Sequence, residues 1–245
     1  MEKIFETFND FINEGVYDKN IFKAILLAGG PGSGKSYVAE KVTFADKLAD
    51  RFPMSSLGLK FISSDIPFEY HLKKEGIPMD LDKLKTENPV EYERAMEIRS
   101  KAKRISETQF DLLLKGRIGL VIDGTGRDFN KIKGIGDNFD SLGYDKIMIF
   151  VNTSLDVALH RNSLRERKVS EDEARKMWKQ VQDNIGKFQR YFGKERFIFI
   201  DNNSYASEDY LMEINKEIRS FLREPIKNEV AQEWIDKEME IKKRK

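Results

Sequence analysis

Five short apolar runs recur along the chain, and polar segments with helical periodicity separate them. Short apolar runs are typical of strands that are buried on both faces, as they are in a parallel sheet. Because a helical segment connects each run to the next, the pattern predicts an α/β fold with a five-stranded parallel sheet flanked by helices. The predicted strands are residues 24–28, 59–63, 119–123, 146–151 and 196–200.

Helices are predicted wherever apolar residues recur every three or four positions. Pro89 suits the first turn of a long helix, and Ser170 and Glu173 have the spacing of a capping box. Residues 66–86 mix proline, glycine and charge, and they are predicted as a short helix followed by a loop. The predicted helices are residues 37–50, 89–115, a segment that ends near Leu142 before Gly143, 155–167, one helix after Ser170 that carries Met177 through Phe188, and about 207–223 and 226–244, with a break at Pro225.

A glycine-rich segment lies between the first predicted strand and the helix that follows it. Residues 29–36 read Gly-Gly-Pro-Gly-Ser-Gly-Lys-Ser and fit G-x-x-x-x-G-K-[ST], the phosphate-binding loop. Glycines let the backbone N–H groups turn toward phosphate oxygens, and the helix N-terminus adds positive potential. We therefore predict binding of ATP and Mg²⁺, with Lys35 at the β- and γ-phosphates and the Ser36 hydroxyl on the metal. The predicted nucleotide-binding residues of the loop are Gly30, Pro31, Gly32, Ser33, Gly34, Lys35 and Ser36.

Carboxylates follow two of the other predicted strands. Asp123 ends an apolar run, which is the Walker B pattern, and its acid is expected to orient Mg²⁺. Asp65 follows the second strand, and the chemistry of open α/β sheets gathers beyond the carboxyl ends of strands. Asp65 is therefore a candidate general base for an acceptor hydroxyl, and a capping or turn residue is the alternative. The turn after Asp123 can expose Thr125 and Arg127 at the same edge.

A cluster of cations follows the fourth strand. Arg161, Arg165 and Arg167 lie between two predicted helices, where a closing lid over about residues 161–176 could bring guanidinium groups to a transferring phosphate. Charge spreads over the phosphoryl oxygens in the transition state, so positioned cations supply much of the catalysis. A solvated helix face is the alternative interpretation.

Composition excludes several classes of function. The 43 Lys and Arg nearly balance the 42 Asp and Glu, which argues against a generally basic nucleic-acid binder but leaves room for a local groove. The chain has no cysteine, so disulfides, thiolate metal sites and a cysteine nucleophile are excluded. His71 and His160 are too far apart in the sequence to suggest a zinc site. Without a membrane-length apolar run or a secretory signal, we expect a cytoplasmic protein with no membrane partner.

Several motifs together resemble the 5′-kinase domain of phage polynucleotide kinase. They are the loop at residues 30–36, Ser64-Asp65, the segment 123–125, and a lid with Arg161-Asn162-Ser163-x-Arg165 followed by Lys168-Val169 and Met177-Trp178. The resemblance covers about residues 23–192. It implies a P-loop kinase fold with a helical lid and C-terminal helices, Asp65 as general base, Arg165 as the lid arginine acting on the phosphoryl group, and Arg161 as the lid's first arginine. Lys35, Ser36 and Asp123 would serve the nucleotide and magnesium.

The sequence departs from that family around the acceptor. The family has a second acid and then an arginine shortly after its base, where this chain has Ile66-Pro67-Phe68, and the segment 66–115 also differs. We expect no phosphatase domain to follow. The turn at residues 123–125 also resembles zeta-toxin kinases, which phosphorylate an amino-sugar nucleotide. Phage kinases of hydroxymethylated bases in DNA are a third family to which we expect a resemblance. The preferred acceptor is a polynucleotide 5′-hydroxyl or a modified base, with a nucleotide-sugar or a nucleoside monophosphate as alternatives.

The two ends of the chain leave further alternatives open. We expect residues 1–22 to form a helical leader, 23–204 the kinase domain and 205–245 a helical appendage. Residues 8–14 resemble the head-targeting leader of proteins packaged in T-even-type phage capsids, which would place the protein in the virion, although a helix that caps the core is favoured. A nucleotide-gated binding protein, acting on a partner through the charged C-terminal helices, is the alternative from another functional class.

Overall fold

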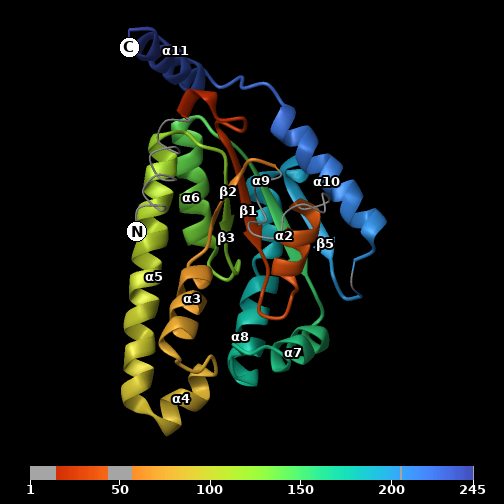
Figure 1. Ribbon diagram of the computed structural model, residues 1–245. Coiled ribbons are helices and arrows are strands. Elements are labelled where there is room, and N and C mark those ends of the chain that lie inside the picture. Colours follow the sequence, from red (N-terminus) through yellow and green to blue (C-terminus); the bar gives the residue numbers. More distant parts are fainter. Residues whose placement is uncertain (1–14, 44–56, 205, 245) are drawn as a thin grey trace.

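The computed structural model describes residues 15–43, 57–204 and 206–244, with side chains omitted at 40–43. It contains a five-stranded parallel sheet flanked by helices, which confirms the predicted fold (Figure 1). The strand order is β2-β3-β1-β4-β5, so β1 lies at the centre and its carboxyl end opens into the glycine-rich loop. The strands are β1 (Lys23–Ala28), β2 (Lys60–Ile62), β3 (Leu120–Asp123), β4 (Asp145–Asn152) and β5 (Phe197–Asp201).

The sheet is buried on both faces. Every residue of β1 is buried, and successive side chains enter opposite cores: Ala24 and Leu26 pack on one side, and Ile25 and Leu27 on the other. This alternation explains why the strands have continuous apolar sequences. The first face is covered by α5 (Pro89–Lys115), α6 (Phe129–Leu142) and α9 (Ile185–Phe192), and the second by α2 (Lys35–Thr43) and α10 (Glu208–Arg223).

The segment before α5 is more helical than its sequence predicts. Instead of one helix and a loop, it forms α3 (Asp65–Glu75) and α4 (Leu81–Glu87). The Asp80 side chain accepts a hydrogen bond from the Lys83 amide (3.1 Å) and so caps α4. Both helices pack on the first half of α5 through a separate apolar cluster that includes Phe68 and Leu84. Burial in this cluster overrides the loop-like composition.

The lid also differs from its prediction in two places. Helix α7 (Leu155–Ser163) ends before residue 167, because the Asn162 side chain donates to the Val169 carbonyl (2.7 Å) and accepts from its amide (3.3 Å), which closes a loop. The helix predicted after Ser170 is divided into α8 (Glu171–Gln182) and α9. Asn184 lies at the division, and its amide donates to the carbonyl of Arg127 (2.9 Å).

The chain closes with a helix at the opposite end of the sheet from the lid. Helix α11 (Glu229–Lys243) lies beside the short helix η1 (Gly15–Tyr17), and Trp234 packs edge-on against Phe22. The break at Pro225 between α10 and α11 is as predicted. The expected leader falls largely outside the described residues, and the three-part division of the chain stays a prediction. In the described part of the chain, no helix has both the length and the apolar character needed to span a membrane.

Candidate active site

The glycine-rich loop lies where the carboxyl ends of β1, β3 and β4 meet. Gly32 and Gly34 have φ angles of 74° and 79°, which L-residues rarely adopt. A Cβ atom on Gly32 would lie 2.1 Å from the carbonyl oxygen of Ala158 in α7. Glycine is therefore required at position 32 both for its backbone conformation and for the close approach of α7.

A buried asparagine after β5 fixes this loop from the other side. Asn202 is 0% exposed, and its side-chain amide donates a 2.8 Å hydrogen bond to the carbonyl oxygen of Ser33. Its side-chain oxygen accepts from the Ala206 amide (3.2 Å), and its backbone amide donates to Asn152 (2.8 Å). The loop is thus held by strands β4 and β5 as well as by its own strand.

Lys35 and Asp123 form an ion pair at the start of α2. Each side chain is 14% exposed, so both lie in a partly buried site open to a ligand. The register pairs Asp123 with Leu27, and Gly124 donates to the Leu27 carbonyl (2.9 Å), which places the acid directly beside the loop. The exposed Ser36 follows Lys35. A hydroxyl and a carboxylate are oxygen donors of the kind that Mg²⁺ prefers, so these residues fit the predicted metal.

Ser63 connects this ion pair to the candidate base. The Ser63 hydroxyl donates to Oδ2 of Asp123 (3.2 Å) and accepts from the backbone amide of Asp65 (3.2 Å). Asp65 is the first residue of α3, and the sheet therefore presents both carboxylates at the same edge. The hydroxyl of Ser106 in α5 lies 3.1 Å from the carbonyl oxygens of both Ser63 and Ala102 and donates to them. It therefore supports Ser63, which bridges Asp123 and Asp65.

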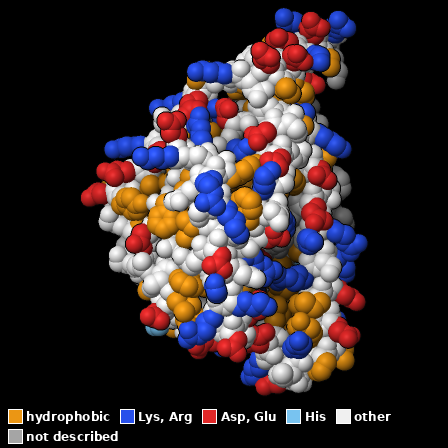
Figure 2. All heavy atoms as spheres, turned by 180° about the vertical axis from the view of Figure 1, so that it is seen from behind, with side chains coloured by type: hydrophobic (Ala, Val, Ile, Leu, Met, Phe, Trp, Pro, Cys, Tyr) orange, Lys and Arg blue, Asp and Glu red, His pale blue; other side chains and the backbone are white. Residues whose placement is uncertain are grey.

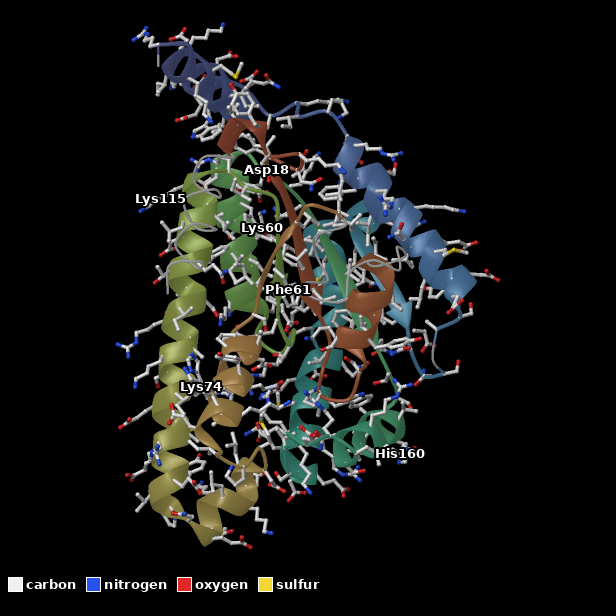
Figure 3. The ribbon with its side chains drawn as sticks, viewed as in Figure 1. Asp18, Lys60, Phe61, Lys74, Lys115 and His160 are labelled. Carbon is white, nitrogen blue, oxygen red and sulfur yellow. The ribbon has the colours of Figure 1, made fainter. Side chains whose placement is uncertain are left out.

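The three lid arginines have different surroundings. Arg161 donates to the carbonyl oxygens of Asn202 (2.8 Å) and Asn203 (3.3 Å), close to the loop. Arg165 follows the end of α7 and is exposed, and within the described part of the chain its side chain makes no hydrogen bond or ion pair. Arg167 instead lies on α3, with Nη2 at 2.9 Å from Oδ2 of Asp65. Both α3 and α7 extend beyond the carboxyl edge of the sheet, where Figure 3 labels Lys74 and His160.

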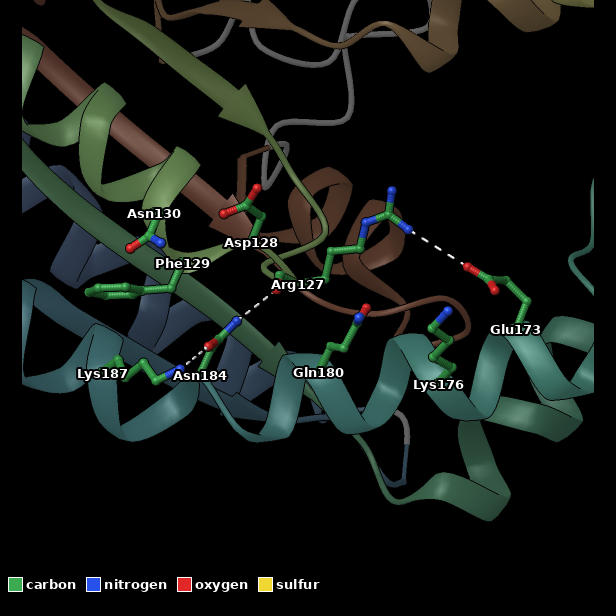
Figure 4. Close-up of a pocket in the computed structure, with 9 residues that line it drawn as sticks. All are labelled: Arg127, Asp128, Phe129, Asn130, Glu173, Lys176, Gln180, Asn184 and Lys187. Carbon is green, nitrogen blue, oxygen red and sulfur yellow. Dashed lines mark hydrogen bonds and ion pairs between the residues drawn. The ribbon is translucent and has the colours of Figure 1, made fainter.

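A polar pocket of about 700 Å³ opens between the turn after β3 and helix α8 (Figure 4). Helix α8 also contacts the phosphate loop, since a Cβ atom on Gly30 would lie 3.8 Å from Val181. Arg127 crosses the pocket toward Glu173, and their charged groups are 3.8 Å apart. The pocket is lined by Arg127, Asp128, Phe129, Asn130, Glu173, Lys176, Gln180, Asn184 and Lys187.

Sequence reasoning missed the supporting roles of two residues, Ser63 and Asn202. The position of each at the end of a predicted strand was a usable signal, because the carboxyl ends of parallel strands converge. Their partners lie 60 and 169 residues away in the sequence, and no local pattern indicates such pairs. Arg167 was included in the cationic cluster, but its contact with Asp65 was not predicted.

The parallel sheet, the glycine loop and the Lys35–Asp123 pair define a P-loop protein with a kinase-like fold. The profile of the family AAA_33, described as an AAA domain, matches residues 25–188. This match covers more than half of the chain, and the protein therefore belongs to that family. No curated protein matches the sequence.

Two solved structures are similar to the chain at low sequence identity. A provisionally assigned kinase from Chloroflexus aurantiacus superposes with a TM-score of 0.52 at 14% identity, covering 82% of this chain and 98% of that one. Shikimate kinase from Acinetobacter baumannii, in complex with shikimate, gives a TM-score of 0.47 at 16% identity, covering 85% and 99%. At 14% identity the likeness to the Chloroflexus structure concerns the fold alone. The resemblance to polynucleotide kinase is not shown by these comparisons.

Proposed function

We propose that the protein is an ATP- and Mg²⁺-dependent kinase that transfers the γ-phosphoryl group to a hydroxyl. One observation carries the proposal: a single serine hydroxyl joins the Lys35–Asp123 pair of the phosphate loop to the candidate base Asp65. The residues proposed for nucleotide binding and the residue proposed as base therefore lie at one edge of the sheet, an arrangement that supports phosphoryl transfer to a hydroxyl.

In this reaction the acceptor oxygen forms a bond to the γ-phosphorus, and the bond from that phosphorus to the β–γ bridging oxygen breaks. Asp65 accepts the hydroxyl proton, and ADP leaves with the bridging oxygen. Lys35 and the loop amides neutralise charge on the β- and γ-phosphates. Arg165, unattached to other described side chains, is proposed to act on the transferring group, while Arg161 holds the lid at the loop after β5.

Magnesium fits the oxygen donors at the start of α2 and the end of β3. Ser36 and Asp123 would hold it, directly or through water, and the bound ion would neutralise charge on the phosphate oxygens. Since Lys35 is paired with Asp123 in this structure, its ammonium group must exchange one anionic partner for another when a triphosphate binds.

For the acceptor, we retain the 5′-hydroxyl of a polynucleotide or a modified base as the first candidate, because of the resemblance of the lid. The pocket between the turn after β3 and α8 has three cations and several amides against two carboxylates in its lining, and this excess of cations suits an anionic acceptor of this kind. A small acceptor, such as a nucleotide-sugar or a nucleoside monophosphate, is the second candidate. It is favoured by the surface charge: Figure 2 shows basic and acidic side chains interspersed over one face, and on α5 both Arg94 and Lys103 pair with glutamates.

The test is transfer of label from γ-labelled ATP to a panel of acceptors: 5′-hydroxyl oligonucleotides, hydroxymethylated DNA, nucleotide-sugars and the four nucleoside monophosphates. Asp65→Asn should slow transfer about 10²- to 10⁴-fold with ATP binding retained. The exposed Asp111 of α5 offers a matched control, and Asp111→Asn should leave transfer unchanged. Hydrolysis of ATP without transfer to any hydroxyl would overturn the proposal and favour a nucleotide-gated binding protein. In that case a pull-down with residues 205–245 should capture the binding partner.

A further inference from the structure

Three consecutive residues of the lid each meet an oppositely charged residue on α3 or at the start of α4. The groups of Glu166 and Lys73 are 3.9 Å apart, and Lys168 lies 3.3 Å from Asp80. Between them, Arg167 contacts two carboxylates of α3. The lid segment is therefore joined to α3 and α4 by a row of complementary charges.

Arg167 makes the strongest contact in this row. Its Nε atom donates to Oε1 of Glu69 (2.8 Å), and Nη2 lies 2.9 Å from Oδ2 of Asp65. Asp65 and Glu69 are one helical turn apart, so a single planar guanidinium can span both. The guanidinium carbon also lies 5.8 Å from the centre of the Phe68 ring. Three residues of the first turns of α3 thus surround one lid side chain.

The contact of Arg167 with α3 is more buried than the ion pair between Lys73 and Glu166. The Arg167 side chain is 16% exposed, whereas Lys73 and Glu166 are 67% and 82% exposed and form a surface pair of little strength. Burial disfavours the Arg167 charge, but Asp65 and Glu69 more than offset this, and the pKa of the guanidinium is raised. Arg167 therefore remains charged and is the residue most able to hold the lid against α3.

We infer that Arg167 is a positioning residue: it latches the lid to α3 and fixes the carboxylate of Asp65 for proton transfer. This inference rests on the proposed function, in which Asp65 is the base. With Oδ2 held by Arg167, Oδ1 is the oxygen that accepts the proton of the acceptor. Because the guanidinium arrives with the lid, Asp65 is oriented when the lid is closed, and lid closure and base orientation become one event.

The contact between the lid and α3 can be tested by crosslinking, without any assay of activity. Because the chain contains no cysteine, two introduced cysteines would be its only thiols. Lys73→Cys together with Glu166→Cys places two thiols on exposed, facing positions, and a short bis-maleimide should crosslink them intramolecularly. Adding Arg167→Gln should slow crosslinking severalfold. Arg175 provides the matched control, since it is exposed on α8 and pairs there with Glu171, so Arg175→Gln should leave the rate unchanged. Equal rates with and without Arg167 would overturn the latch.

The effect on the base is tested by steady-state kinetics with the best acceptor of the panel. Arg167→Gln should lower kcat about 10- to 100-fold with the KM for ATP nearly unchanged, because misplacement of a reacting group costs factors of this size. Arg167→Lys should recover only part of the loss in kcat. Its ammonium keeps the positive charge, but it cannot span both carboxylates as the guanidinium does. Glu69→Gln should have a smaller effect, because the Asp65 contact remains. A kcat for Arg167→Gln equal to that of the wild type would overturn the positioning role.

The two proposals fail in distinguishable ways. If the wild type transfers phosphate to no acceptor, or if Asp65→Asn leaves transfer unchanged, the proposed function is wrong, while the crosslinking result still decides the latch. If Asp65→Asn abolishes transfer but Arg167→Gln changes neither kcat nor crosslinking, the proposed function stands and the inference about Arg167 is wrong. A circular dichroism spectrum of each variant establishes that it is folded before either result is used.

Discussion

The side-chain amide of Asn202 donates a 2.8 Å hydrogen bond to the carbonyl oxygen of Ser33, across 169 positions of sequence. Both residues are almost fully buried. The bond ties the phosphate loop to the end of β5, and Arg161 of the lid contacts the carbonyl oxygen of the same asparagine. Loop, last strand and lid thus share one point of attachment.

Removing this attachment should weaken both folding and nucleotide binding. Asn202→Ala leaves the Ser33 carbonyl and the Ala206 amide without their partner, which should lower the free energy of unfolding by about 1–3 kcal/mol. The measurements are urea unfolding and titration with ATP. Asn138→Ala, at an exposed position of α6, is the control and should leave ATP affinity unchanged without lowering the free energy of unfolding. Wild-type affinity in Asn202→Ala would show that β5 does not support the loop.

Two glycines allow a matched comparison of loop and helix. Gly32→Ala would place a methyl group against the Ala158 carbonyl at a positive φ, and we expect ATP affinity to fall about 10- to 100-fold.

Gly134 lies within α6, with open space where a methyl group would sit, so Gly134→Ala should raise the free energy of unfolding by about 0.5–1 kcal/mol. Isothermal titration and urea unfolding measure the two effects, and unaltered ATP binding by Gly32→Ala would contradict the first.

The bridge through Ser63 predicts a kinetic effect. Ser63→Ala removes the hydroxyl between Asp123 and the amide of Asp65, and it should lower kcat about tenfold or more, because a hydrogen bond to a charged group is lost. Ser106→Ala removes the support behind Ser63 but leaves the bridge intact, so its kcat should fall less. Comparison of kcat for the two variants checks the prediction, and equal losses would mean that the bridge itself has no part in the rate.

Asp80 predicts a dependence of stability on pH. Its pKa is lowered, chiefly because the Lys83 amide donates to it, and Lys168 adds to the effect although burial opposes it. A carboxyl whose pKa is lowered on folding stabilises the protein above its unfolded pKa, and this contribution is lost as pH falls through the folded value. Stability should therefore decrease on acidification below the ordinary range of aspartate.

Two substitutions separate the cap from the charge of Asp80. Asp80→Asn retains a capping oxygen but cannot titrate, so it should reduce the acid-dependent loss and cost little at neutral pH. Asp80→Ala removes the cap as well and should cost about 1 kcal/mol at neutral pH. Thermal unfolding followed across the acidic range measures both, and an unchanged pH profile for Asp80→Asn would contradict the assignment.

The fold was largely predictable because its signals are local. A strand buried on both faces needs a continuous apolar run, and the glycine loop needs a fixed string of residues between β1 and α2. Where tertiary contacts override local composition, the prediction was wrong: α4 was expected as a loop, α7 was expected to extend to residue 167, and α8 and α9 were expected as one helix. In each case a side chain of one segment bonds to the backbone of another, or an apolar cluster buries a polar stretch.

By itself, the sequence determined the α/β class, the phosphate loop and the residues available for chemistry. The tertiary structure decided the order of the strands and therefore which strand ends are neighbours. That order places Ser63 between Asp123 and Asp65, sets Asn202 against the loop, and directs Arg167 onto the candidate base. The reason is physical: the Ser63–Asp123 and Asn202–Ser33 hydrogen bonds join groups 60 and 169 residues apart, and only the packing of the sheet brings such distant groups within bonding distance.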